Sequence, residues 1–178
     1  MNIRKAASHD IDAIEKIYDS IHELENEGKI TTGWITGIYP MRSTAEAALK
    51  RGDLFVYDLD GEILASAIIN NTQVDVYADC NWKFKADDSE VCVLHTLVVD
   101  PKSAGQGIGT QFVAFYEAYA ENSGCRALRI DTNARNTAAR KLYAKLGYIE
   151  SATVPCVFNG IPDVKLVLLE KKVGDTNA

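Results

Sequence analysis

The chain has few cysteines, and their arrangement is unlike that of a metal site or a disulfide framework. Four of its 178 residues are cysteine, at positions 80, 92, 125 and 156. None of them forms a C-x-x-C pair, the spacing typical of many zinc and redox sites. We therefore predict no bound metal and no disulfide, and we expect reduced thiols in a cytoplasmic protein.

The sequence also lacks an excess of positive charge and a long apolar run. It carries 19 Lys and Arg against 25 Asp and Glu, a net charge of −6, whereas nucleic-acid-binding proteins normally have a basic face. No apolar run approaches the ~20 residues that span a bilayer, and the N-terminus has no signal-peptide pattern. We expect a soluble protein with neither a nucleic-acid nor a membrane partner.

Linkers, internal repeats and low-complexity segments are missing as well. A length of 178 residues suits one domain with a sizeable core. We therefore predict a single domain over residues 1–172, followed by a C-terminal tail at residues 173–178.

The most informative segment joins an apolar strand to a helix through a glycine-rich turn. Residues 91–99 are mostly apolar and β-branched, as in a strand buried on both faces, and a helical pattern begins at residue 108. Glycines in the turn leave backbone amides open, and the first N–H groups of a helix attract an anion. The sequence thus predicts an anion site at Ala104, Gly105, Gln106, Gly107, Ile108, Gly109 and Thr110.

Hydrophobic periodicity predicts the element order β-α-α-β-β-β-α-β-α-β-β along the chain. The first helix starts near residue 8, and Ser43-Thr44-Ala45-Glu46 is a capping-box pattern for the second. Turns at residues 58–61 and at Asn159-Gly160 indicate two hairpins. This order favours an α+β fold in which helices flank a mixed sheet.

A second motif lies at residues 136–148, which read Asn-Thr-Ala-Ala-Arg-Lys-Leu-Tyr-Ala-Lys-Leu-Gly-Tyr. It resembles N-x-x-A-x-x-L-Y-x-x-x-G-F/Y, a signature of the Gcn5-related N-acetyltransferase (GNAT) superfamily. The glycine turn resembles the acyl-CoA-binding signature of the same family: Gly107 and Gly109 match it, and Ala104 stands where Arg or Gln is usual. Two motifs in the family's order, within the family's element order, extend the resemblance over almost the whole chain.

The resemblance implies a GNAT fold, with a mixed and mostly antiparallel sheet, and an acetyl-CoA-dependent N-acetyltransferase. It implies direct transfer of the acetyl group from acetyl-CoA, the co-substrate, to a primary amine of a small molecule or peptide. Amides of the turn would hold the pyrophosphate, and the strand end would pair with the pantetheine arm and polarise the thioester. Cofactor contacts are thereby implied for the turn residues and for Leu97, Val98, Val99, Asn136 and Tyr143, where Asn136 alternatively caps its helix.

Acetyl transfer needs a base for the amine and an acid for the departing thiolate. The family's Leu-Tyr pair implies that Tyr143 is the acid, although Tyr143 also fits a buried helical stripe. His95 is the only side chain within residues 91–99 that ordinarily titrates near neutral pH, and it is the candidate base, as in one branch of the family; it equally fits a neutral core histidine. Asp131 is the alternative base, or a loop carboxylate that caps local amides.

The acceptor pocket of the family forms from the first helix, the loop after it and the late strands. Aromatic side chains in these places hold a substrate or a cation, or else anchor loops on the sheet. A lone apolar cysteine is more typical of structure than of a nucleophile. The candidate acceptor-binding residues are Trp34, Tyr39, Asp131, Cys156 and Phe158.

Two other functions compete with a transferase. One is a catalytically silent, CoA-binding regulatory module of the same fold, which the presence of both Tyr143 and His95 disfavours. The other is a nucleotide-binding α/β domain, which would need a G-x-G-x-x-G turn after an early strand or a Walker lysine, and would leave the 136–148 motif unexplained. The resemblance also raises a homodimer as an assembly to test.

Overall fold

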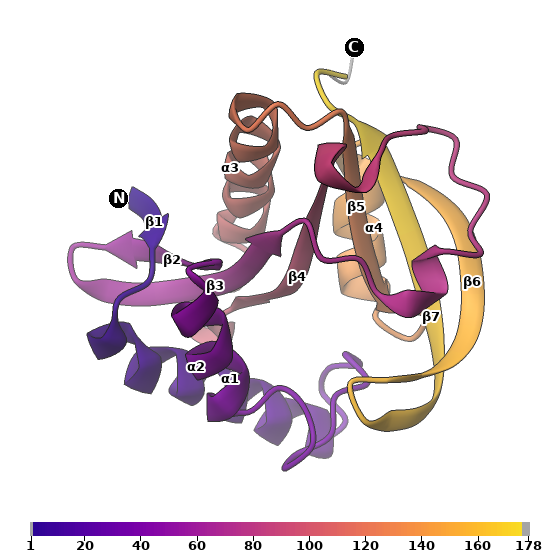
Figure 1. Cartoon of the computed structure of the whole chain (residues 1–178). Coiled ribbons are helices and arrows are strands. Elements are labelled where there is room, and N and C mark those ends of the chain that lie inside the picture. The colour runs from indigo at the N-terminus through magenta and orange to yellow at the C-terminus, as the bar shows by residue number, and fades with distance from the viewer. Residues whose placement is uncertain (1, 176–178) are drawn as a thin grey trace.

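The computed structural model describes residues 2–175 and contains one seven-stranded sheet with the order β1-β2-β3-β4-β5-β7-β6 (Figure 1). β4 and β5 are parallel, and the other neighbouring strands are antiparallel. The fold is therefore the expected α+β fold, and the order of its elements is as predicted. The strands are β1 (Asn2–Lys5), β2 (Leu54–Leu59), β3 (Glu62–Asn70), β4 (Val91–Val99), β5 (Ala127–Asn133), β6 (Ile149–Phe158) and β7 (Ile161–Lys172).

Within residues 2–175, four α-helices lie on the two faces of the sheet, namely α1 (Ile11–Asn26), α2 (Arg42–Arg51), α3 (Ile108–Asn122) and α4 (Thr137–Lys145). One face packs on α3 and α4 through a core that includes Phe112, Tyr116 and Tyr143. On the other face, α1 and α2 cover β2 and β3. Residues 71–90, which we call the β3–β4 segment, cover β5 and β7 on that same face (Figure 1).

Two local predictions need correction. Helix α2 begins at Arg42, because the Thr44 hydroxyl accepts a hydrogen bond from the Met41 amide at 3.1 Å, so the cap lies two residues before the predicted Ser43 box. In β4, Val91 to Leu94 and Val98 are buried, whereas His95, Thr96, Leu97 and Val99 are half-buried beside a cavity. The prediction of a strand buried on both faces was therefore wrong for these four residues.

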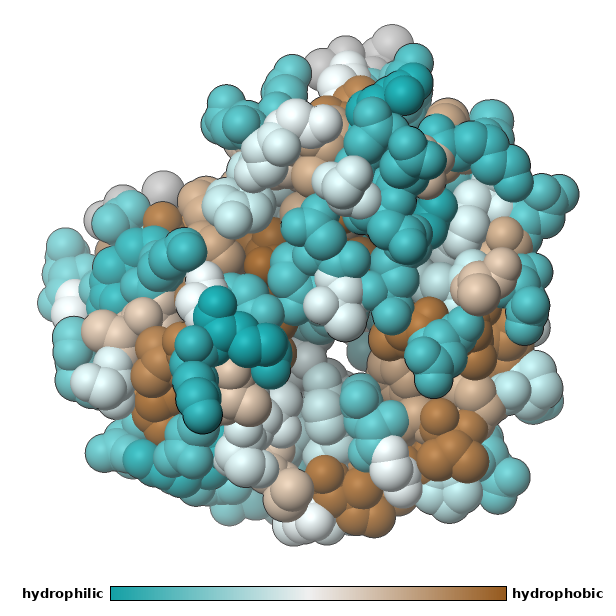
Figure 2. Space-filling model, in the orientation of Figure 1, coloured by the Kyte–Doolittle hydropathy of each residue, from teal (hydrophilic) through white to brown (hydrophobic). Residues whose placement is uncertain are grey.

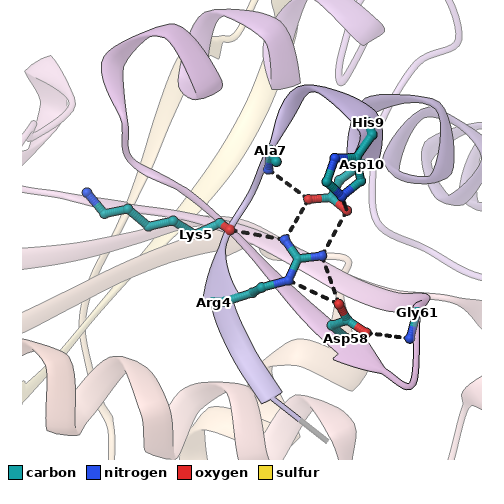
Figure 3. Close-up of polar contacts among 7 residues, drawn as sticks. All are labelled: Arg4, Lys5, Ala7, His9, Asp10, Asp58 and Gly61. Carbon is teal, nitrogen blue, oxygen red and sulfur yellow. Dashed lines mark hydrogen bonds and ion pairs between the residues drawn. The ribbon is translucent and has the colours of Figure 1, made fainter.

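The N-terminal strand is fixed to the first helix and to the β2–β3 turn by one arginine (Figure 3). The Arg4 guanidinium donates to both oxygens of Asp10 at 2.7 and 3.0 Å, and to Asp58 at 2.8 Å. The Asp10 carboxylate, 2% exposed, also accepts from the Ala7 amide at 2.7 Å. This cluster lies away from the cavity described below, so we assign it a structural role.

No helix within residues 2–175 is long and apolar enough to cross a membrane. At the C-terminal end, Val173 still packs against the core and donates to the Arg126 carbonyl at 3.1 Å. Residues 176–178 of the expected tail lie outside the described residues.

Candidate active site

A cavity of about 540 Å³ lies between α1 and α2 on one side and β5, β6 and β7 on the other. Figure 2 shows the molecule hollowed near the centre of the same view. Its wall combines aromatic and aliphatic side chains with a few polar groups. The predicted site residues on the wall are Trp34, Tyr39, His95, Leu97, Val98, Val99, Asp131, Asn136, Tyr143 and Phe158.

The cavity continues into a gap between the two parallel strands. β4 pairs with β5 only from Val91 to Leu94, and the strands then diverge toward the lower part of Figure 1. β4 remains paired with β3 on its other side as far as Val99, with an irregularity near Thr96, whose φ is 50°. Backbone N–H and C=O groups between His95 and Val99 that face the gap are therefore left without a strand partner.

The glycine turn lies just beyond the end of β4, at the N-terminus of α3. Gly105 and Gly107 have φ angles of 79° and 77°, which other residues rarely adopt, and Gly107 is the N-cap of α3. Gly109 lies in a tightly packed place, because a Cβ there would lie 3.3 Å from Leu142 Cδ2 of α4. The turn thus exposes the first amides of α3, as the anion-site prediction requires, and residues Ala104–Thr110 lie beside the cavity rather than on its wall.

Helix α4 contributes two predicted residues to the cavity. The Asn136 side chain accepts from the Ala139 amide at 3.1 Å, so it caps α4 and also lines the cavity. The Tyr143 ring packs edge-on against Tyr148 with centroids 5.8 Å apart, and no described residue bonds its hydroxyl. Burial and the negative charge of Asp131 raise the pKa of Tyr143 well above its ordinary value.

His95 is held by one ring nitrogen. Its Nε2 lies 3.1 Å from Asn70 Oδ1 and 3.0 Å from the Thr72 carbonyl, both of which are acceptors in this arrangement. Nε2 therefore carries the proton, and Nδ1 is the nitrogen left to accept one. Burial lowers the pKa of His95, so the ring is neutral at neutral pH.

Asp131 lies in the C-terminal half of β5 and lines the cavity. Its Oδ2 accepts a hydrogen bond from the Tyr77 hydroxyl at 2.7 Å. Burial raises the pKa of Asp131 to about 6, although the hydrogen bond from Tyr77 opposes this change. Asp131 is therefore a carboxylate that ionises close to neutral pH inside the cavity, and not an exposed loop group.

The loop between α1 and α2, residues 27–41, which we call the strap, closes one side of the cavity. Glu25 accepts hydrogen bonds from the Thr32 amide at 2.6 Å and from the Gly33 amide at 3.1 Å. The Thr31 hydroxyl donates to the Arg135 carbonyl at 2.7 Å. The strap is thereby fixed both to α1 and to the loop that follows β5.

The predicted acceptor residues do not all reach the cavity. Trp34 and Tyr39 lie on the strap with ring centroids 6.0 Å apart, and the Tyr39 hydroxyl bonds the Thr96 hydroxyl. Phe158, at the end of β6, also lines the cavity, whereas Cys156 on the same strand does not. Burial, with a smaller effect of Asp131, raises the pKa of the Cys156 thiol, which disfavours a nucleophilic thiolate.

No sequence pattern marks several polar residues that line the cavity or contact its wall, namely Asn70 and Thr72 on the wall and Tyr77 behind Asp131. Tyr77 lies in a segment of irregular structure and short 3₁₀ turns, where neither a period of 2 nor one of 3.6 marks its neighbours. Asn70 and Thr72 follow the end of β3 and are recognised only by their contacts with His95. These contacts are long-range in sequence, and no local pattern encodes them.

Known proteins share this sequence pattern and this fold. An uncharacterised N-acetyltransferase of Methanocaldococcus jannaschii is 34% identical over 79 residues, which are 44% of this chain and 35% of that relative. An N-acetyltransferase from Staphylococcus aureus Mu50 has a similar structure, with a TM-score of 0.68 and 21% identity over 97% of this chain and 98% of that one. A Salmonella typhimurium structure with its cofactor acetyl-CoA gives a TM-score of 0.68 and 18% identity, covering 100% of this chain and 96% of that one.

The family itself follows from a match that covers most of the chain. The sequence profile of the acetyltransferase (GNAT) family matches residues 15–148. That range contains the glycine turn and every cavity-lining residue of α1, the strap, β4, β5 and α4. The chain belongs to the acetyltransferase (GNAT) family.

Proposed function

We propose that this protein is an acetyl-CoA-dependent N-acetyltransferase that transfers an acetyl group directly to a primary amine of a small molecule or a peptide. The observation that carries the proposal is the gap between β4 and β5. It begins after Leu94, has Tyr143 on its wall, and leads to the glycine turn at the start of α3. A donor with an amide-bearing arm and a pyrophosphate matches both parts of this surface.

The donor arm has partners along the open edge of β4. Its amides find unpaired N–H and C=O groups between His95 and Val99, as an added strand would. The exposed amides around Gly107, at the positive end of the α3 dipole, supply the pyrophosphate contacts. This arrangement directs the thioester end of the arm toward the cavity that Tyr143 lines.

The acceptor side of the cavity fits an amine that carries an apolar part. Trp34, Tyr39 and Phe158 supply aromatic wall, and Asp131 supplies a negative charge in an enclosed place. Attraction between a carboxylate and an ammonium group is strongest where water is excluded. We therefore place the amine of the acceptor on this side, facing the thioester.

Tyr143 has the properties of the acid that protonates the departing thiolate. Its raised pKa keeps the hydroxyl protonated at neutral pH, and no described residue holds that proton in a hydrogen bond. On the base side, two groups of the wall are able to accept the ammonium proton, His95 through Nδ1 and Asp131.

Calorimetric titration of the purified protein with acetyl-CoA, with ATP and NAD as controls, tests the donor. We expect micromolar binding of acetyl-CoA alone, and amines are then screened by release of the CoA thiol. Absence of acetyl-CoA binding contradicts the proposal. Binding without turnover of any amine in the screen favours the silent CoA-binding module instead.

A further inference from the structure

The contact between Asp131 and Tyr77 joins the cavity to a part of the chain that lies outside both family motifs. Tyr77 belongs to a 3₁₀ turn of the β3–β4 segment, is 2% exposed, and donates its hydroxyl hydrogen to Asp131 Oδ2 at 2.7 Å. The ring lies edge-on to Trp82 with centroids 5.1 Å apart, and the Trp82 indole N–H donates to the Tyr77 carbonyl at 2.9 Å. Tyr77 is therefore held on both its ring and its backbone.

The β3–β4 segment is in turn fixed to the sheet by buried polar contacts. The Glu170 carboxylate of β7 accepts from the amides of Lys83 and Phe84 at 2.8 and 2.9 Å. The Arg129 guanidinium, two residues before Asp131 on β5, stacks 4.2 Å from the centroid of the Trp82 ring. These contacts fix the β3–β4 segment on the sheet and thereby the position of the Tyr77 hydroxyl relative to β5.

Only one of the two carboxylate oxygens of Asp131 is used inside the protein. Oδ2 is bonded by Tyr77, whereas Oδ1 accepts no hydrogen bond from any residue that the structure describes, and Asp131 lines the cavity. The titratable groups that face it from neighbouring elements are Tyr77, Tyr39 of the strap, Tyr143 of α4 and Cys156 of β6. None of these is cationic, so the ionised carboxylate has no charge partner in the described chain.

We infer that Asp131 binds the ammonium group of the acceptor through Oδ1 and accepts its proton, and that Tyr77 is the positioning residue that holds Asp131 for this step. The inference rests on the proposed acetyl transfer, for which it names the base. It also narrows the acceptor to an amine that enters as an ammonium ion. A pKa of about 6 leaves about ten ionised carboxylates for one protonated at pH 7.

The transfer proceeds through two proton transfers from the nitrogen and one exchange of a C–S bond for a C–N bond. One ammonium proton passes to Asp131 and from there to water. The freed nitrogen lone pair then forms the N–C bond to the thioester carbonyl carbon. The C–S bond breaks as Tyr143 gives its hydroxyl proton to the sulfur, and the second proton lost by the nitrogen restores the Tyr143 hydroxyl.

Asp131 suits this role better than His95 for two reasons visible in the structure. His95 has no charge with which to attract an ammonium ion, because burial lowers its pKa and keeps it neutral. Asp131, by contrast, is close enough to Tyr143 for its charge to raise the pKa of the proposed acid.

The test follows the carboxyl ¹³C signal of Asp131 across pH in the full-length protein labelled at aspartate, with Asp131→Asn to assign it. We expect the signal to titrate near pH 6, and we expect phenethylammonium, used as the probe amine, to lower this midpoint. In Tyr77→Phe the midpoint should rise by about one pH unit, because a hydrogen bond to the charged form is lost. Tyr116→Phe is the matched control: it removes another buried hydroxyl, bonded to the Cys92 carbonyl at 2.6 Å, and should leave the midpoint unchanged.

The same variants are then compared in the pH dependence of kcat/KM, with the amine found by thiol release. Asp131→Asn should abolish the acidic-limb pKa and lower kcat/KM about 100-fold or more. Tyr77→Phe should move that limb to higher pH, and His95→Gln should leave it in place.

The inference is overturned if Asp131 titrates near its ordinary pKa, if Tyr77→Phe leaves the Asp131 midpoint unchanged, or if only His95→Gln removes the limb. Failure of acetyl-CoA to bind overturns the proposed function instead, and calorimetry on the same samples reads that outcome separately.

Discussion

Gly33 of the strap lies directly against the Asn133 side chain at the end of β5. A Cβ atom on Gly33 would come within 2.2 Å of Asn133 Nδ2, and the φ angle of Gly33 is +79°. The glycine therefore lets the strap approach β5 closely enough to close the cavity. The strap and β5, which lie about 100 residues apart in the sequence, are thus in direct contact.

The first prediction concerns that contact. Gly33→Ala must move the strap or Asn133, so we expect kcat/KM for the amine to fall about 10-fold or more while acetyl-CoA affinity stays unchanged. Gly37→Ala is the control in the same loop, since its φ is +75° but nothing lies within 4 Å of the new Cβ. Both variants carry a backbone strain of about 1 kcal/mol. Equal kinetics in the two variants, measured by thiol release, would contradict a role of this contact.

The second prediction concerns the donor. Gly107→Glu places a negative side chain at the N-terminus of α3, and we expect acetyl-CoA affinity in calorimetry to fall about 100-fold or more. Gly124→Glu is the matched control, because Gly124 follows the other end of α3 with a φ of +76° and open space around it. Similar losses of affinity in both variants would show that general strain, and not the phosphate site, is responsible.

The third prediction concerns the acid. Tyr143→Phe keeps the ring packed and removes the hydroxyl, so kcat should fall about 100-fold or more with little change in acetyl-CoA affinity. Tyr148→Phe removes a neighbouring buried hydroxyl that has no hydrogen-bond partner in the described chain. Steady-state kinetics should leave this control near wild type. Unchanged turnover in Tyr143→Phe would exclude the role.

The fourth prediction links the site to stability. Burial raises the pKa of Asp131 from 3.8 to about 6, which means that the folded protein binds the carboxyl proton more tightly than the unfolded chain does. The stabilisation that this proton supplies is fully present below pH 3.8 and is lost as the pH rises through 6. At pH 7 the native protein therefore contains a destabilising charge. Asp131→Asn should stabilise the fold by up to about 3 kcal/mol at pH 7 and by little at pH 4. Thermal unfolding at the two pH values checks this, and a variant less stable than wild type at pH 7 would contradict it.

The fifth prediction uses the cluster of Figure 3. Burial of Asp10 disfavours its charge, but the hydrogen bonds from Arg4 and from the Ala7 amide outweigh this effect and lower the pKa of Asp10. Arg4→Ala leaves that carboxylate buried without its counter-charge and should destabilise the protein by about 2–4 kcal/mol at neutral pH. The loss should shrink as acid protonates Asp10. Denaturant unfolding measures it, and kcat at 25 °C should stay near wild type.

The element order, the glycine turn and the helix of the second motif were predictable because their signals are local. The turn from Ala104 to Thr110 and the motif from Asn136 to Tyr148 each combine a backbone requirement with helical periodicity inside a short window. The acceptor side was harder, because it depends on contacts between distant segments. Tyr77 reaches Asp131 from an irregular segment, and the burial that raises the pKa of Asp131 arises only once the chain is folded. No hydrophobic periodicity in the sequence encodes either of these features.

The early end of pairing between β4 and β5 has a consequence for the sheet as a whole. Every other neighbouring pair in the described sheet is antiparallel, so this parallel pair is the one seam between the β1–β4 half and the β5–β7 half. Beyond Leu94 and Ile130 no backbone hydrogen bond of this pair crosses the seam. A donor arm laid along β4 would therefore act as a short additional strand, and its binding would add backbone hydrogen bonds where the two halves of the sheet have none between them.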